Sequence, residues 1–256
     1  MRIGGISVCD NGERIVLNDD MNRKLVSYPG TSQLLSANDI IGELNYGGNE
    51  NIYSVVPFRT GYIASGCFGN NIFSWMNGEG SNGVLFGEYP GNTSIVGTHE
   101  FMMRNQLLMA VDQKDTYFVA AGVFCDWIAF YQYKNGAVLL NKEYFSYDSE
   151  LDVLSFETGS NMSYAIQENS GTMRAYRYLY PAEKDFFALY WGIKSDDLNE
   201  NNNGCYIIQF GYDGRLKSIF QVDEMLRSFA VDELSRTIYG VTFSSEVQEV
   251  IKTYKY

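Results

Sequence analysis

The sequence predicts an all-β protein, and three features carry that prediction. Short apolar runs are broken throughout by Gly, Asn and Asp, and no long segment has the 3.6-residue period of a helix. Asn-Gly and Asp-Gly pairs recur between the runs, where they favour tight hairpins. Similar strand–turn–strand units also repeat along the 256 residues. Together these features favour many short strands joined by turns.

The expected strands are rich in β-branched and aromatic residues, which favour extended backbone. Several are apolar at successive positions, which indicates strands buried on both faces between stacked sheets. The helical turns that the sequence predicts are short, and residues 223–226 are an example. In chain order the clearest strand candidates are residues 14–17, 61–64, 117–121, 127–131, 186–190 and 237–241.

The turn signals lie between these strands. Prolines stand at the edges of runs, as at Pro29 and Pro90, where a missing N–H does not interrupt a ladder. Asp112 and Asp232 each open a turn in which a carboxylate can accept backbone N–H groups. The hairpin dipeptides are Asn11-Gly12, Asn77-Gly78, Asn82-Gly83, Asn135-Gly136, Asn203-Gly204 and Asp213-Gly214.

Repetition then specifies the architecture. Residues 131–138 and 210–216 both contain an aromatic strand, an Asn-Gly or Asp-Gly turn, and an outward strand of mixed polarity. Four-stranded units of about 40–45 residues are typical of a β-propeller. The first and last units look short, which predicts a ring left incomplete on the N-terminal side. About five units can be placed, at residues 3–28, 52–89, 106–145, 172–222 and 226–256, with 146–171 as a long connection or part of a further blade.

The composition disfavours several classes of function. Lys and Arg number 19 and Asp and Glu 31, a formal net charge of −12, which disfavours nucleic acid and anionic membrane surfaces as partners. The single His99 excludes multi-histidine metal sites. No run approaches the roughly 20 apolar residues that span a bilayer, and no signal peptide is evident. Cys9, Cys67, Cys125 and Cys205 form no C-x-x-C pair, so buried free thiols are expected, with one disulfide as the alternative.

Several segments occur in the order of a known family. They are the aromatic strand end 186–192, the strand and hairpin 206–214, the segments 229–233 and 238–242, and earlier 66–68 with 87–90. The chain resembles the TolB-like six-bladed β-propeller-like proteins common in gut Bacteroidales. That resemblance implies a six-bladed propeller in the cell envelope and implies no enzymatic activity. Family members are usually longer and begin with a lipoprotein signal, and the sequence departs from that pattern.

Two acidic segments contain the oxygen ligands that calcium prefers. Residues 195–203 are dense in oxygen ligands, but their spacing does not match an EF-hand, so a solvated hairpin is expected. Residues 18–22 are expected to be a turn. Paired carboxylates could perform acid–base hydrolysis, yet no spacing singles out one pair.

The remaining candidates are His99 and the tryptophans. His99 beside Glu100 could serve as a general base in a loop, but no nucleophile motif accompanies it. Trp75, Trp127 and Trp191 are expected to pack between blades, with Trp191 the best candidate for an exposed, sugar-stacking ring. The glycosylation-type triplets 92–94 and 161–163 carry no assigned role.

These observations predict one β-propeller domain over residues 1–256. We expect it to act as a non-catalytic module that binds a protein or glycan on one face, and the family resemblance implies that it lies in the cell envelope. The alternatives are a hydrolase that uses carboxylates or calcium in the central channel, and a purely structural module of a longer chain. The sequence assigns no catalytic, cofactor or metal residue, and leaves the ligand-binding residues and the oligomeric state open.

Overall fold

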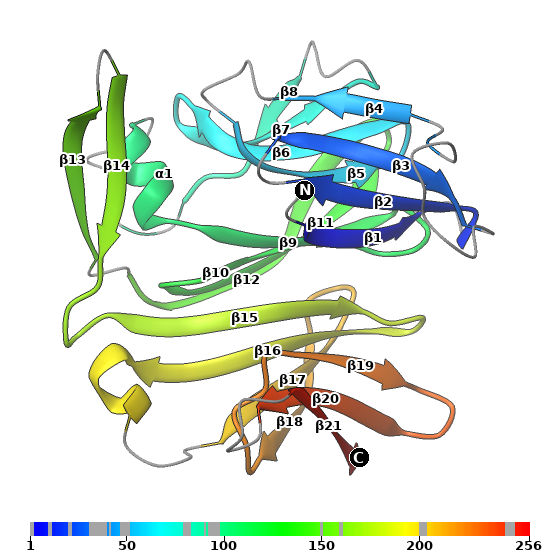
Figure 1. Ribbon diagram of the computed structural model, residues 1–256. Helices are drawn as coiled ribbons and strands as arrows, with labels where there is room; N and C mark the ends of the chain where they lie inside the picture. Colours follow the sequence, from blue (N-terminus) through cyan, green and yellow to red (C-terminus); the bar gives the residue numbers. More distant parts are fainter. Residues whose placement is uncertain are drawn as a thin grey trace. The chain divides into compact units, whose positions relative to one another are not determined.

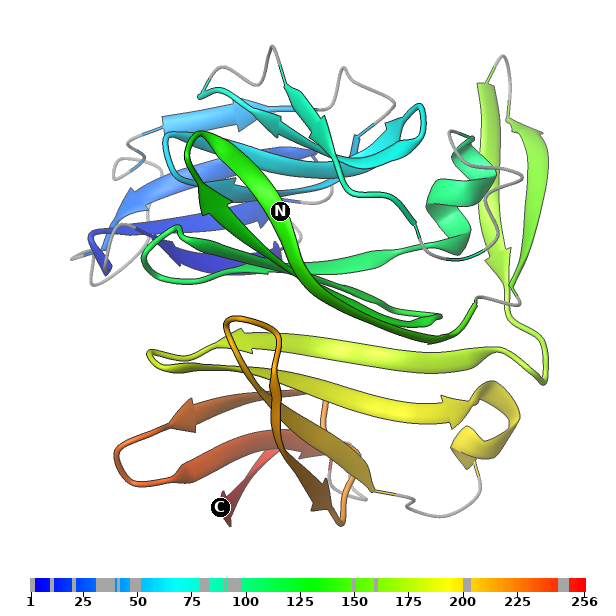
Figure 2. The ribbon, with the colours of Figure 1, turned by 180° about the vertical axis from the view of Figure 1, so that it is seen from behind.

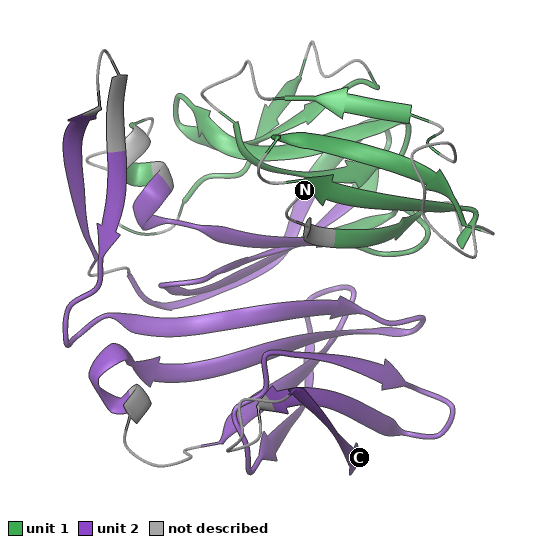
Figure 3. Cartoon of the chain, viewed as in Figure 1, with its two compact units in different colours: residues 1–102, 111–118, 133–138 green, residues 103–110, 119–132, 139–256 purple. Residues whose placement is uncertain are grey.

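A computed structural model describes most of the chain. The described residues are 3–9, 12–19, 22–30, 40, 42–46, 52–78, 83–89, 91, 98–148, 151–158, 161–199, 204–243 and 249–256. Their contacts define two compact units, coloured separately in Figure 3. Unit 1 holds residues 1–102, 111–118 and 133–138, and unit 2 holds residues 103–110, 119–132 and 139–256.

Unit 1 contains two four-stranded sheets in which each strand pairs antiparallel with the next one along the chain (Figure 1). The predicted unit at 3–28 is wrong in its extent, because a fourth strand follows it. Buried aliphatic side chains such as Val16, Leu25 and Val55 form the core of these sheets. The strands are β1 (Ile3–Cys9), β2 (Arg14–Asp19), β3 (Lys24–Pro29), β4 (Gly42–Asn45), β5 (Ile52–Phe58), β6 (Gly61–Phe68), β7 (Asn71–Met76) and β8 (Val84–Phe86).

A third sheet contributes residues to both units. Its strands are β9 (Leu107–Val111), β10 (Tyr117–Gly122), β11 (Asp126–Lys134) and β12 (Ala137–Tyr147), again adjacent in chain order. The predicted turn at Asn135-Gly136 joins β11 to β12. Its φ angles of 53° and 85° are those of a type I′ turn, in which both central residues need positive φ.

Unit 2 continues with a hairpin and two further sheets (Figure 2). The hairpin occupies the stretch that the sequence left as a connection or a partial blade. The last sheet has three strands. The strands are β13 (Asp152–Thr158), β14 (Asn161–Gln167), β15 (Met173–Pro181), β16 (Asp185–Lys194), β17 (Cys205–Gly211), β18 (Leu216–Val222), β19 (Ser228–Asp232), β20 (Thr237–Phe243) and β21 (Glu249–Lys255).

Strand β16 shows why the apolar runs are continuous. Phe186 and Ala188 belong to one buried cluster, which includes Phe130 from β11. Phe187 and Leu189 point the other way into a second cluster with Phe229 of β19. The strand is therefore buried on both faces, as its sequence predicts.

A turn in unit 2 packs directly on a neighbouring sheet. The Tyr144 hydroxyl of β12 donates a hydrogen bond to the Gly214 carbonyl at 2.9 Å. Gly214 follows β17 and has a φ of 82°. A Cβ at this position would lie 2.6 Å from Cβ of Lys142 and 3.0 Å from the ring of Phe130. Only glycine therefore fits this position without displacement.

The helical segments differ from the prediction. Residues 223–224 form a bend and residues 225–226 are irregular, so the expected helical turn is absent there. The helices among the described residues are α1 (His99–Arg104) and the 3-10 helix η3 (Ser195–Asn199). None of the described helices is long and apolar enough to cross a membrane.

Sheets of four strands that follow one another in chain order are the blades of a β-propeller. The described residues form five such sheets, four with four strands and one with three, together with the β13–β14 hairpin. The all-β class, the β-propeller fold and the five units expected from the repeats are confirmed.

Candidate ligand-binding site

The acidic segments behave as turns and caps. Asp19 accepts hydrogen bonds from the backbone N–H and the side-chain amide of Asn22, at 3.3 and 2.7 Å, within the predicted turn. Ser195 opens η3, so the hairpin expected over 195–203 is wrong for its first five residues. Residues 200–203 lie outside the described part of the chain. Within the described residues no group of three or more His, Cys, Asp or Glu side chains could hold a metal ion.

His99 and Glu100 begin α1, where the sequence predicted a loop. Their side chains lie outside the described residues, so the structure does not test the general-base interpretation of His99, for which the sequence offers no nucleophile motif. Residues 92–94 also lie outside the described part. Residues 161–163 form the first part of β14.

Trp127 and Trp75 both pack against neighbouring side chains. Trp127 is 0% exposed, and its indole N–H donates to Glu143 at 3.3 Å. Trp75 contacts Phe58 and Tyr133 edge to face, with ring centroids 6.3 and 5.3 Å apart. Trp191 is partly buried, as Trp75 is, and it differs because a cation lies over its ring.

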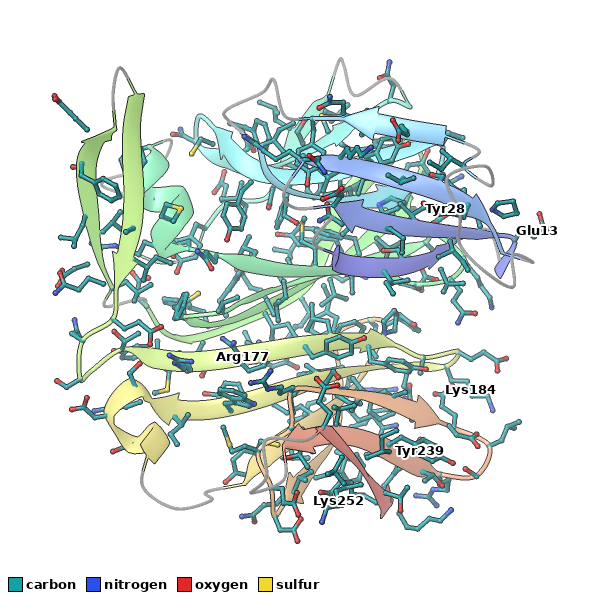
Figure 4. All side chains as sticks on the ribbon, viewed as in Figure 1. Glu13, Tyr28, Arg177, Lys184, Tyr239 and Lys252 are labelled. Carbon is teal, nitrogen blue, oxygen red and sulfur yellow. The ribbon has the colours of Figure 1, made fainter. Side chains whose placement is uncertain are left out.

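That cation is Arg177 of β15, which is labelled in Figure 4. Its guanidinium carbon lies 4.7 Å from the centroid of the Trp191 ring. Trp191 is fixed in turn, because its indole N–H donates to the Leu226 carbonyl at 2.8 Å. A cation over an indole face is held by the quadrupole of the ring. Residues from three separate segments therefore position one guanidinium.

The backbone at this point is irregular in both strands. Arg177 is an extra residue of β15, because its neighbours Tyr176 and Tyr178 pair with the adjacent residues Tyr190 and Leu189 of β16. Gly192, directly after Trp191, has a φ of 61°. A β-bulge redirects the side chain it carries, and bulges are frequent next to functional sites.

Two further arginines act on Arg177. Burial lowers the pKa of the Arg177 guanidinium, the positive charges of Arg174 and Arg227 lower it further, and Glu168 raises it. Arg174 forms an ion pair with Glu168 at 2.8 Å. Like charges so placed repel one another. We call Arg174, Arg177, Arg227 and Trp191 the arginine face.

Two tyrosines lie beside it on the same two strands. Tyr176 and Tyr190 are cross-strand partners with ring centroids 5.0 Å apart, and the negative charge of Asp126 acts on both. The Ser146 hydroxyl donates to Asp126. Burial is the largest cause raising the pKa of each tyrosine, and it raises that of Tyr190 to about 12.

Sequence reasoning identified Trp191 but missed the arginines. A usable signal was present, since Arg174 and Arg177 lie in an otherwise aromatic and aliphatic strand of a chain with net charge −12. Their approach to Arg227 could not be read from the sequence, because about 50 residues separate them.

Similarity searches find the fold without a family. No protein-family model and no curated protein matches the sequence. A solved member of the DUF4221 family from Bacteroides vulgatus matches with a TM-score of 0.51 and 9% identity. That match covers 96% of this chain and 76% of the other.

Two much longer chains match similarly. One belongs to the mitotic checkpoint complex, with a TM-score of 0.50 and 12% identity over 100% of this chain and 62% of the other. The second is hydrazine synthase of Kuenenia stuttgartiensis, with a TM-score of 0.50 and 9% identity over 97% of this chain and 59% of the other. This chain thus spans about three fifths of each. At such identities the likeness concerns the fold alone, and the class of the chain is a β-propeller scaffold.

Proposed function

We propose that this chain is a non-catalytic binding module of the cell envelope, which holds a protein or glycan partner through the arginine face. The observation that carries the proposal is the position of Arg177. It is stacked on Trp191 and placed near two like charges. Repulsion of this kind disfavours folding, so the arrangement is better explained by recognition of a partner than by stability.

The more specific assignments belong to the same proposal. The chain is a single domain with six blades of the TolB-like type, and the β13–β14 hairpin is the candidate for part of the sixth blade. The sequence resemblance supports the blade number and the envelope location. Fractionation of cells that produce the natural protein tests the location, and recovery in the cytoplasmic fraction would contradict it.

Affinity capture from a solubilised envelope extract tests the binding function, together with a glycan array. We expect the unmodified chain to retain one partner in stoichiometric amount. The Arg177→Gln variant should lose at least nine tenths of it. Arg236→Gln is the matched control, because Arg236 lies over the ring of Tyr256 in the same unit, at 5.6 Å. Failure of the unmodified chain to enrich any protein or glycan would overturn the proposal.

A further inference from the structure

We infer that the arginine face binds an oxyanion, and that Arg177 grips two of its oxygens. The inference rests on the proposed binding function and names the chemical group that is recognised. Carboxylate, sulfate and phosphate groups share this chemistry, and each could be carried by a glycan or a protein partner.

The first argument concerns the hydrogen-bonding capacity of Arg177. A guanidinium has five N–H donors. Within the described residues Arg177 makes no hydrogen bond or ion pair, and its contact with Trp191 uses the face of the group. Because the N–H bonds lie in the guanidinium plane, stacking leaves them available for an acceptor approaching in that plane.

The second argument comes from the other stacked arginines. Arg23 lies over Tyr46 and donates to the Ile52 carbonyl. Arg59 lies 4.1 Å from the ring centroid of Tyr133 and donates to the Asp115 carbonyl at 3.4 Å. These two guanidinium groups thus have backbone acceptors, which Arg177 lacks among the described residues.

The third comparison is Arg236, which covers the ring of Tyr256. Glu233, Asp185 and Asp232 raise the pKa of Tyr256, so acidic groups act on the residue that Arg236 covers. The charges acting on Arg177 are instead two arginines and one glutamate, and that glutamate already bonds to Arg174. Arg177 therefore stands out by its positive surroundings.

An oxyanion would fill the open N–H donors of Arg177 and offset the positive charge around it. Two of its oxygens match the planar fork of an arginine in bidentate geometry. Its negative charge also relieves the repulsion from Arg174 and Arg227. A neutral sugar or an apolar peptide would do neither, so an acidic group is the ligand class that this face fits.

The test is a titration of the full chain with sulfate, phosphate or glucuronate, with chloride added to keep ionic strength constant. At ten times the Kd a specific ligand raises the Tm of a protein of this size by about 3–5 °C. We expect that rise, absent with chloride alone, from at least one of the three anions. Which anion is strongest distinguishes carboxylate from sulfate and phosphate sources.

Variants assign the effect to Arg177. Arg177→Gln should abolish the rise, and Arg236→Gln should preserve it. Arg177→Lys keeps the positive charge but lacks the planar pair of N–H donors, so its Kd for the anion should be at least tenfold higher. This variant replaces Arg177→Gln in the test if Arg177→Gln does not fold. An equal rise in the Arg177 variants, or none in the unmodified chain, would overturn the inference. The two proposals can fail separately. If the partner is captured through Arg177, but oxyanions neither stabilise the chain nor displace that partner, the binding function stands and the oxyanion inference fails.

Discussion

At the scale of single residues, Asp112 shows how one side chain holds a turn. It is 7% exposed and lies between β9 and β10. Its carboxylate accepts the backbone N–H groups of Thr116 and Tyr117, both at 2.6 Å, and of Lys114 at 3.3 Å. Asp232 does the same between β19 and β20, for Leu234 and Ser235. Both carboxylates therefore do what the sequence predicted.

Replacing Asp112 by alanine should destabilise the fold by about 2 kcal/mol, since it leaves partly buried N–H groups without this acceptor. Urea denaturation followed by circular dichroism measures the change. Asp232→Ala is the comparison, and its smaller effect should reflect the exposed N–H groups that it caps. Equal losses in the two variants would show that burial of the turn does not matter.

The raised pKa values of Tyr176 and Tyr190 predict that the protein loses stability in alkali. The pKa of Tyr190 is raised from 10 to about 12, mainly by burial, and that of Tyr176 is raised further. A raised folded-state pKa stabilises the protein fully below the unfolded value and loses this effect as the pH passes the folded value. The free energy of unfolding should therefore decline from about pH 10 to pH 12.

Burial raises the pKa of Cys205 from 9 to about 11. The free energy of unfolding should therefore begin to decline at about pH 9. Unfolding free energies measured from pH 8 to 12 test the expectation. Tyr190→Phe should flatten the decline above pH 10, and an unchanged slope would contradict the assignment.

At the scale of the element, the β11–β12 turn depends on backbone handedness. Gly136→Ala places a Cβ at a φ of 85°, which should cost about 1–2 kcal/mol. Gly42→Ala is the control, because a Cβ there meets only Cβ of Ser27 at 3.9 Å. We expect the control variant to lie within about 0.5 kcal/mol of the parent in the same denaturation assay. A stable Gly136→Ala protein would mean that the turn can change type.

The same element shows what the sequence can predict. Asn135-Gly136 has a steric requirement confined to two residues, so the hairpin follows from local pattern alone. The strand at 186–190 is likewise readable, because burial on both faces leaves a continuous apolar run. The bulge at Arg177 is not readable, because it depends on how β15 and β16 pair. The helix at His99 was missed because six residues are too few for a periodic pattern.

At the scale of the whole molecule, the reactivity of the four cysteines shows whether the chain unfolds as one cooperative unit. All four are free and buried, as the sequence predicted, with Cys9 and Cys67 in unit 1 and Cys125 and Cys205 in unit 2. Buried thiols react only when the surrounding structure opens. In native buffer we therefore expect negligible reaction with a thiol reagent.

In rising guanidinium, a single domain over residues 1–256 predicts that all four thiols become reactive at one denaturant concentration. Mass spectrometry of labelled peptides measures each site separately. If Cys9 and Cys67 became reactive at a lower guanidinium concentration than Cys125 and Cys205, the two units would unfold independently. Cys205→Ala provides the control for peptide assignment.

The contact of Tyr144 with Gly214 bears on how this chain can be altered. The turn after β17 is a packed part of the structure, because its glycine lies against Lys142 and Phe130. Insertions, fusion junctions or affinity tags placed there would push two sheets apart. The exposed tip at Asn135-Gly136 has no side-chain or backbone atom within 4 Å of the position a Cβ would take at Gly136, so it can accept an added segment. Hairpin turns with almost the same sequence thus differ in their tolerance of lengthening.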